Sequence, residues 1–150
     1  MSLPYQPRSS YVVMCDFTGF VAPEMVKYRD VVVLAPNKQN NKLVTVVPLS
    51  TTPPKTVERH HHLLASNPRP HGDQREQVWA KCDMVYTVAL ARLDSYFTHT
   101  RRGGRQTVNR KVSVEDFAAI QRAVAFALNL GDNQVVPARG LESSSASALN

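Results

Sequence analysis

The sequence has little cysteine and no long apolar run, and both features narrow the class of protein. Its two cysteines, Cys15 and Cys82, have no metal-ligand or redox spacing, so neither a disulfide framework nor a metal site is indicated. Both lie in apolar, strand-like segments, where free cysteine usually packs as a small buried hydrophobe. No stretch approaches the roughly 20 apolar residues that cross a bilayer. The first ten residues lack the basic-then-apolar order of a signal peptide, which predicts a cytoplasmic protein.

The chain has fewer acidic than basic residues. It contains 12 Asp and Glu against 18 Lys and Arg, which gives a formal net charge of +6. The chain has 150 residues, of which 43% are hydrophobic, and this suits one globular domain. The basic excess fits a polyanionic partner, either nucleic acid or an acidic protein. It fits equally well a charge that only keeps a small domain soluble.

Short β-branched segments follow one another through the first two thirds of the chain, each bounded by turn residues. Strands are predicted at 10–17, 28–35 and 42–49, with a hairpin turn at Asn40-Asn41 between the last two. A further short strand is predicted within 56–65, and one bent strand or two strands within 77–93. The Pro- and Gly-containing segment 66–73 is predicted to be a loop.

One helix is predicted near the end of the chain. Apolar residues recur there at helical spacing, at Phe117, Ile120, Val124 and Leu128. Ser113 followed by Asp116 is an N-terminal capping signal, and Gly131 is the expected C-terminal stop. The polar stretch after it has too little apolar surface to fold.

Five to seven short strands and one amphipathic helix indicate a mainly β protein with added α, built as a small barrel or curled sheet. We expect residues 1–10 to be a lead-in, 11–131 the barrel domain, and 132–150 a flexible tail.

Polar residues interrupt the apolar segment "VWAKCDMV" at 78–85. Strand alternation predicts that Val78, Ala80 and Cys82 face the core. Trp79, Lys81 and Asp83 then face the other way, with α-carbons of Lys81 and Asp83 about 6.6 Å apart. This spacing lets an ammonium and a carboxylate flank one phosphate. A solvated strand face has the same pattern and is the commoner case.

Two other strand ends offer groups that bind phosphate. Arg29 opens the strand at 28–35, close to Lys27. Three hydroxyl side chains follow the strand at 42–49, from Ser50, Thr51 and Thr52. Hydroxyls and backbone amides in such a loop can bind phosphate oxygens, although clusters of Ser and Thr also serve simply as turns.

A basic segment at 98–111 contains five cationic residues and no acidic one: Arg101, Arg102, Arg105, Arg110 and Lys111. Gly103-Gly104 predicts a flexible loop there. With the aromatic residues at 96–97, it fits single-stranded RNA, an acidic protein segment, or merely a solvated loop.

The run His60–His62 lacks the paired ligand spacing of a zinc site, so no metal is predicted. On a strand, His60 and His62 would share a face. A pH-sensitive contact to RNA is the alternative.

Three segments in order resemble the PemK/MazF-like toxins of bacterial type II toxin–antitoxin systems. They are "YRDVVVLAP", "VVPLSTT" and "KCDMVYTV", followed by the basic "RRGGR" and the terminal helix. The resemblance covers about 11–131. It implies an SH3-like barrel, a homodimer, and metal-independent cleavage of single-stranded RNA such as mRNA, without a cofactor. An antitoxin with an acidic, partly disordered segment is the implied partner.

The resemblance also implies roles for individual residues. Asp83 matches the base, Lys81 the acid and charge stabiliser, and Arg29 the strand-opening arginine, while Ser50 and Thr51 match the hydroxyl pair. Trp79 would lie beside Asp83, where partial burial of that carboxyl would raise its pKa. Thr52, Lys27, Trp79, Arg101, Arg102 and Arg105 are the further candidate contacts to RNA.

The sequence departs from the family pattern at three places. Lys81 stands where arginine is usual, the loop at 18–27 contains no histidine, and Asp30 replaces a proline next to Arg29, with which it could pair. A non-catalytic homologue that binds RNA or a protein such as gyrase is therefore the alternative hypothesis.

Overall fold

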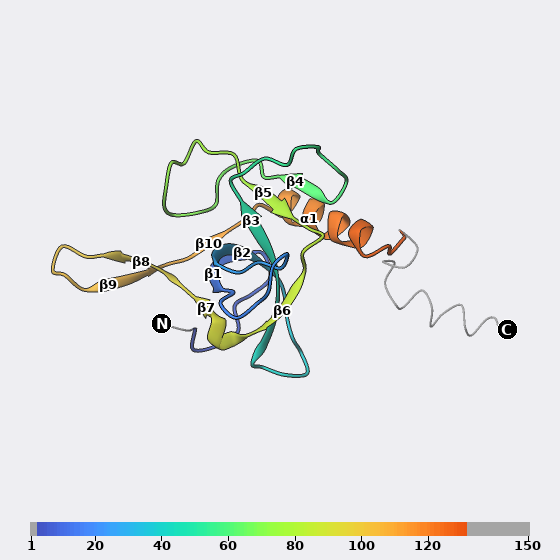
Figure 1. Ribbon diagram of the computed structural model, residues 1–150. Coiled ribbons are helices and arrows are strands. Elements are labelled where there is room, and N and C mark those ends of the chain that lie inside the picture. Colours follow the sequence, from blue (N-terminus) through green and yellow to red (C-terminus); the bar gives the residue numbers. More distant parts are fainter. Residues whose placement is uncertain (1–2, 132–150) are drawn as a thin grey trace.

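The computed structural model describes residues 3–131, which form a curled β-sheet, a projecting hairpin and one α-helix (Figure 1). Three long strands make an antiparallel centre: β1 (Tyr11–Asp16), β2 (Tyr28–Pro36) and β3 (Leu43–Ser50). Their valine-rich sequences suit a pleated surface that is buried on both faces. The three long strands and the turn after Asn40 are confirmed, with boundaries shifted by one residue at most.

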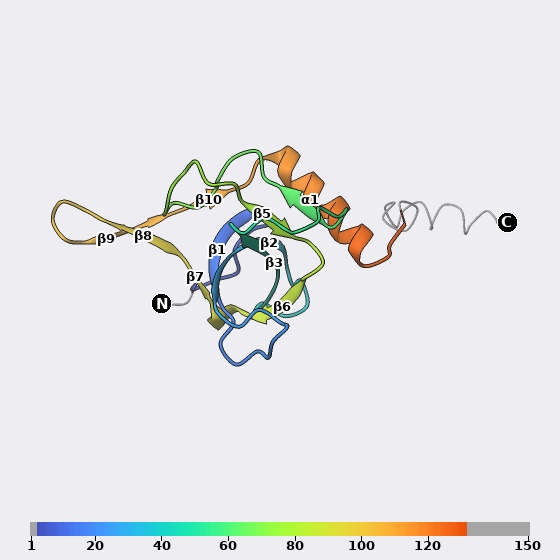
Figure 2. The ribbon, with the colours of Figure 1, turned by 45° about the horizontal axis from the view of Figure 1, so that its top comes forward.

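Short strands extend this centre and close it. β5 (Trp79–Lys81) pairs with the end of β3, and β4 (His61–Leu63) pairs with β5. β6 (Tyr86–Ala89) pairs with the start of β3. After the 3₁₀ helix η1 (Leu90–Arg92), β7 (Leu93–Asp94) pairs with β1. Because β6 and β7 are consecutive yet pair with different long strands, the sheet curls around its interior (Figure 2).

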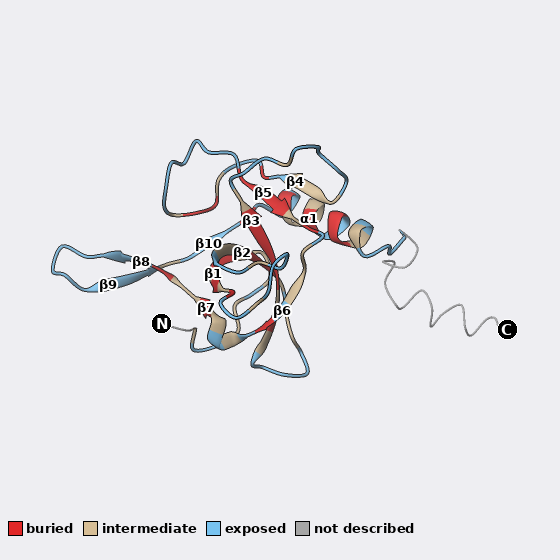
Figure 3. Ribbon diagram, in the orientation of Figure 1, coloured by how far each residue is buried: buried red, intermediate tan, exposed pale blue. Residues whose placement is uncertain are grey.

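The two faces of the curled sheet carry separate cores. Val31, Val33 and Val46 point to the interior, together with Phe17. The alternate residues of β2 and β3, such as Val32, face the helix. Figure 3 shows buried segments along the sheet and the inner side of the helix, while the long loops and the hairpin are mostly exposed.

Helix α1 (Val114–Ala127) begins as predicted, since Ser113 accepts a hydrogen bond from the Asp116 backbone N–H at 3.0 Å. The Asp116 carboxylate is itself buried and accepts from the Ala65 N–H and from His62. These contacts tie the first turn of α1 to β4. No helix within residues 3–131 is long and apolar enough to span a membrane.

The end of the helix differs from the prediction. Asn129 has φ 59°, and the backbone N–H groups of Asn129 and Leu130 donate to the carbonyls of Phe126 and Ala125. This is the Schellman arrangement, in which a left-handed residue stops the helix. Asn129 and not Gly131 is therefore the stop, and Leu128, predicted on the apolar face, is 52% exposed.

The basic segment is also more ordered than predicted. β8 (Tyr96–His99) and β9 (Arg105–Val108) form a hairpin, and β10 (Arg110–Lys111) returns to pair with β1. Gly103, with φ 83°, occupies the turn, so this glycine serves the turn of a hairpin and not a flexible loop.

The fold class is confirmed as mainly β with one terminal helix, although residues 3–131 contain ten strands where five to seven were predicted. The lead-in is ordered from Leu3, where the Gln6 amide donates to the carbonyls of Asn37, Asn40 and Leu43. The tail predicted at 132–150 lies outside the described residues.

Both cysteines are fully buried and free, as predicted. Burial raises the pKa of the Cys15 and Cys82 thiols to about 12. At pH 8 only about one thiol in ten thousand would then be the reactive thiolate. We expect a disulfide reagent to leave the native protein unmodified for hours at pH 8 and to modify both thiols in guanidinium chloride. Rapid reaction in native buffer would contradict this burial.

Candidate functional site

A cavity of about 90 Å³ lies where β2 begins and β3 ends. Its walls include Arg29, Asp30, Leu49, Ser50, Thr51 and Arg69. The register of β2 and β3 pairs Val31 with Pro48, and its continuation sets Arg29 opposite Ser50. In the next pair of strands, Ser50 lies opposite Trp79. Three strand ends thus meet at one place.

Two nitrogen atoms near this meeting point lack hydrogen-bond partners. Within residues 3–131, Nε of Arg29 and Nε1 of Trp79 are the buried side-chain polar atoms without one. Both are obligate donors, and leaving a buried donor unpaired costs about 1–3 kcal/mol. Arg29 lines the cavity, so an anion held there could accept from its side chain, whereas Trp79 is not among the wall residues.

The hydroxyl cluster is partly committed to a turn. The Ser50 hydroxyl accepts from the Thr52 backbone N–H at 3.1 Å, and Thr51 lines the cavity. Thr51 and Thr52 are exposed. Lys27 is exposed in the loop before β2 and does not line the cavity. Ser50 and Thr51 are thus brought next to Arg29, whereas Lys27 is not.

Arg69 is a member of the cavity that the sequence did not reveal. It comes from the loop predicted at 66–73 and is only 8% exposed. Its guanidinium donates to Glu76 at 2.7 Å and to the Asn67 side chain at 3.2 Å. These contacts hold a second cation against the cavity that Arg29 lines.

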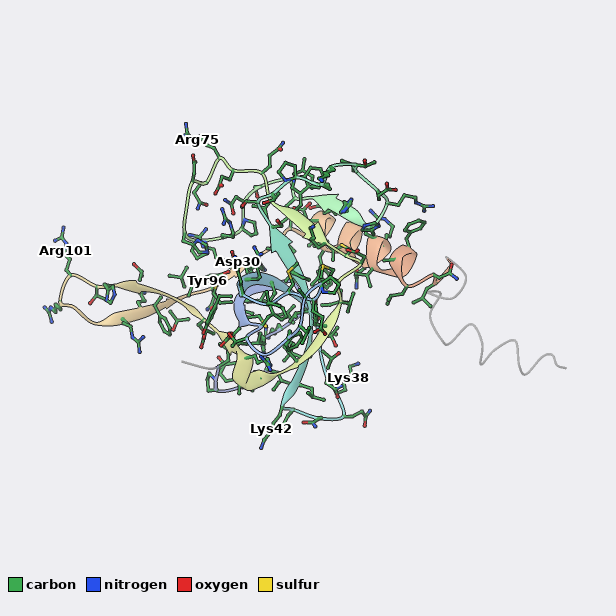
Figure 4. All side chains as sticks on the ribbon, in the orientation of Figure 1. Asp30, Lys38, Lys42, Arg75, Tyr96 and Arg101 are labelled. Carbon is green, nitrogen blue, oxygen red and sulfur yellow. The ribbon has the colours of Figure 1, made fainter. Side chains whose placement is uncertain are left out.

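Asp30 forms no ion pair with Arg29 among the contacts of residues 3–131, so the pairing expected from the sequence is wrong. Asp30 accepts instead from the Tyr96 hydroxyl and from His71 at 2.9 Å. Arg69 lies 3.9 Å away. Burial and the Asp30 carboxylate raise the pKa of Tyr96, which keeps its hydroxyl a donor. Figure 4 shows Asp30 and Tyr96 together at the base of the hairpin.

Lys81 and Asp83 lie outside the set of residues that line the cavity. Val78, Ala80 and Cys82 are buried as predicted, but Trp79 is buried too, at 8% exposure, instead of facing solvent. β5 ends at Lys81, and the Met84 N–H closes a turn onto the Lys81 carbonyl at 3.0 Å. Asp83 is in this turn, half-exposed.

Asp83 faces a histidine and not the tryptophan that the sequence suggested. Its Oδ2 lies 3.6 Å from Nε2 of His60. The ring centroids of His60 and His61 are 4.1 Å apart, with the rings tilted by 51°. His61 lies opposite Lys81 in the β4–β5 register. A carboxylate, an ammonium and two imidazoles thus gather at the end of β5.

The three histidines have different environments. His61 accepts from the Glu58 backbone N–H at Nδ1, and burial together with His60 lowers the His61 pKa. His62 contacts Asp116 at 2.8 Å and so belongs to the helix packing. His60 lies directly before β4 and contacts Asp83, whereas His62 contacts Asp116, so the two side chains have different partners. No group of three potential ligands within residues 3–131 could hold a metal ion.

The cationic residues of the hairpin lie away from both groups. Arg101, Arg102 and Arg105 are exposed, and Figure 4 shows Arg101 at the far tip. The guanidinium of Arg105 lies 4.5 Å from the ring centroid of Phe97. The hairpin extends well beyond the curled sheet and offers positive charge on its own (Figure 1).

Sequence comparison gives one family model and one curated relative. The sequence model described as "PemK-like, MazF-like toxin of type II toxin-antitoxin system" matches residues 9–128. The uncharacterized protein YifN of Escherichia coli (strain K12) is 33% identical over 150 residues, covering 86% of this chain and 96% of YifN.

Solved structures share the fold at low identity. MazF from Deinococcus radiodurans aligns with a TM-score of 0.56 and 16% identity over 82% of this chain and 96% of its own. An endoribonuclease in complex with its cognate antitoxin, from a mycobacterial species, aligns with a TM-score of 0.55 and 19% identity over 84% of this chain and 98% of its own.

Proposed function

The chain belongs to the PemK-like, MazF-like toxin family of type II toxin–antitoxin systems, and on that basis we propose that it is a metal-independent endoribonuclease acting on single-stranded RNA. Cleavage of mRNA in the cytoplasm would inhibit translation and growth. Neighbours of the same fold include a protein named as an endoribonuclease, which supports this activity class.

One observation carries the proposal: the cavity with Arg29, Arg69, Ser50 and Thr51 in its walls. The Arg29 guanidinium, with its unpaired buried Nε–H, and two hydroxyls offer donors to a phosphate group. Arg69 adds a second guanidinium in the wall, although it is already paired with Glu76 and lies 3.9 Å from Asp30. The hairpin cations Arg101, Arg102 and Arg105 would attract the rest of the strand.

The chemistry needs no external nucleophile, because RNA carries the 2′-hydroxyl. We assign Asp83 as the base that takes the 2′-hydroxyl proton while the 2′-oxygen bonds to phosphorus. Lys81 gives a proton to the 5′-oxygen as the P–O5′ bond breaks, and Arg29 stabilises the negative charge of the intermediate. The products are a 2′,3′-cyclic phosphate and a free 5′-hydroxyl.

In this scheme the bound RNA must be extended, because the proposed catalytic residues lie at two separate places. Arg29 lines the cavity, whereas Lys81 and Asp83 lie at the other end of β5. Trp79 and Lys81 are two residues apart, which is about 6.6 Å along a strand. The long Lys81 side chain can span part of this separation, and the bound RNA must bring the scissile phosphate between the two groups.

The same separation favours a second candidate function, a non-catalytic binder of RNA or protein. A cavity that holds a phosphate binds RNA whether or not a base and an acid reach the strand. In either case we propose a homodimer restrained by an antitoxin whose acidic segment would cover the cationic groups, since one mycobacterial neighbour is described in complex with its cognate antitoxin.

Substrate chemistry separates the two candidates. In excess EDTA we expect the protein to cut single-stranded RNA and to leave a 2′,3′-cyclic phosphate, identified by mass spectrometry. An oligonucleotide with 2′-deoxyribose at the cut position should bind equally well and stay intact, because it lacks the nucleophile. RNA that is bound but uncut would contradict the nuclease and leave the binder.

A further inference from the structure

We propose a nucleobase-binding groove between the loop that carries Arg69 and the β8–β9 hairpin, occupied by a base of the same single-stranded RNA. The groove has a volume of about 790 Å³, and its walls include Met14, Pro70, His71, Tyr96, Phe97 and Arg110. This proposal rests on the proposed function for its ligand class, single-stranded RNA, and does not depend on cleavage.

The walls of the groove suit the flat face of a base. The Phe97 side chain is 38% exposed, although phenylalanine is usually buried. The side chain of His71 is 48% exposed, and its ring centroid lies 5.8 Å from that of Tyr96. Exposed aromatic rings on the wall of a groove are the platforms on which single-stranded nucleic acids stack their bases.

The charge of the groove has the sign that RNA requires. No acidic side chain is among its wall residues, and Arg110 is a cation in that wall. Arg105 lies over the Phe97 ring at 4.5 Å, where it could meet a phosphate while the ring meets a base. A purely apolar partner would gain nothing from these two arginines.

The groove adjoins the phosphate cavity through consecutive residues. Arg69 lines the cavity, and the next two residues, Pro70 and His71, line the groove. Asp30 lies at the junction, since it is itself a wall of the cavity and accepts hydrogen bonds from His71 and Tyr96 of the groove. A nucleotide whose phosphate fills the cavity can therefore place a neighbouring base in the groove.

The test uses binding of a fully 2′-O-methylated RNA oligonucleotide, which cannot be cut through its 2′-oxygen. Phe97→Ala should weaken binding about tenfold, from the usual contribution of one stacked base. Phe97→Trp should restore it. Phe126→Ala is the matched control, because Phe126 is 43% exposed and lies under Arg59 at 4.2 Å, on the helix away from the groove; we expect a change of less than about twofold.

A second measurement separates stacking from charge. Oligonucleotides that each lack one base should show a position where the parent loses about tenfold in affinity and Phe97→Ala loses nothing further. Equal binding by Phe97→Ala and Phe126→Ala, or no binding by the parent, would overturn the groove. A tenfold effect of Phe97→Ala on binding, in a parent that does not cut RNA, would support the groove while removing the nuclease. Cleavage by the parent without an effect of Phe97→Ala on binding would support the nuclease and overturn the groove.

Discussion

Arg29→Ala is expected to lower kcat/KM for RNA cleavage by about a hundredfold to a thousandfold, the usual cost of losing a group that stabilises transition-state charge. Arg29 is half-buried at the start of β2, and its Nε has no partner within the described chain. The residue lies in the wall of the cavity with Ser50 and Thr51. A fluorogenic RNA oligonucleotide in EDTA measures the loss directly.

Arg75→Ala is the matched control for Arg29→Ala. Arg75 is on the outer part of the loop that follows Arg69, where its side chain is 91% exposed and paired with Asp73 at 3.0 Å (Figure 4). Both changes remove one positive charge, so general attraction between protein and RNA is altered equally. Arg29→Lys should recover only part of the activity, because an ammonium cannot form the two parallel hydrogen bonds of a guanidinium. Equal losses in Arg29→Ala and Arg75→Ala would contradict a specific phosphate site.

The strands and the start of the helix were predictable because local sequence determines them. Runs of consecutive valines indicate β1, β2 and β3, and Ser113 caps the helix through a residue only three positions away. The end of the helix was not predictable, because Asn129 and Gly131 can both adopt the left-handed conformation. Only the hydrogen bonds of the folded chain determine which of them ends the helix.

The β8–β9 hairpin was not predicted from the sequence, for a different reason. β9 is mostly exposed and polar, and β8 is buried only at Tyr96, so the pair lacks the apolar alternation by which a strand is recognised. Their pairing is stabilised by the ladder itself, and at the base by the Tyr96 contact to Asp30. Hydrophobic patterns in a sequence reflect which residues are buried, and few residues of a projecting hairpin are buried.

The residues of the candidate site that lie at strand ends could be predicted from the sequence, whereas the one that lies in a loop could not. Arg29, Ser50 and Thr51 are next to strands whose register is fixed, so their meeting follows from β2 pairing with β3. Arg69 comes from a loop whose path depends on contacts to Asn67 and Glu76. No periodicity in the sequence indicates where such a loop returns to the sheet.

Asp30 illustrates the same limit within a strand. Its neighbour Arg29 is the obvious partner in the sequence, yet the contacts of the Asp30 carboxylate go to residues far along the chain. The carboxylate then joins the loop, through His71, to the hairpin, through Tyr96. A residue that departs from the family pattern thus connects the loop and the hairpin at the edge of the cavity.

Asp83→Asn and Lys81→Ala are expected to lower the cleavage rate by about a hundredfold to ten-thousandfold each, the usual contribution of a general base or acid. Binding of 2′-O-methylated RNA should change by less than about threefold, because neither residue lines the phosphate cavity. A loss in kcat with little change in affinity is the signature of a group that acts in the transition state.

Matched controls are available for both changes. Asp73→Asn removes a carboxylate that is 49% exposed, close to the 45% of Asp83, and Lys38→Ala removes an exposed ammonium from the turn between β2 and β3. Both controls should cleave at the parental rate. If Arg29→Ala loses cleavage while Asp83→Asn keeps it, then Asp83 is not the base, and the proton must leave through another group at the end of β5, of which His60 at 3.6 Å is the nearest to Asp83 among the described contacts. If expression arrests growth in the parent and equally in Asp83→Asn and Lys81→Ala, toxicity comes from binding alone, as the separation between the cavity and the end of β5 allows.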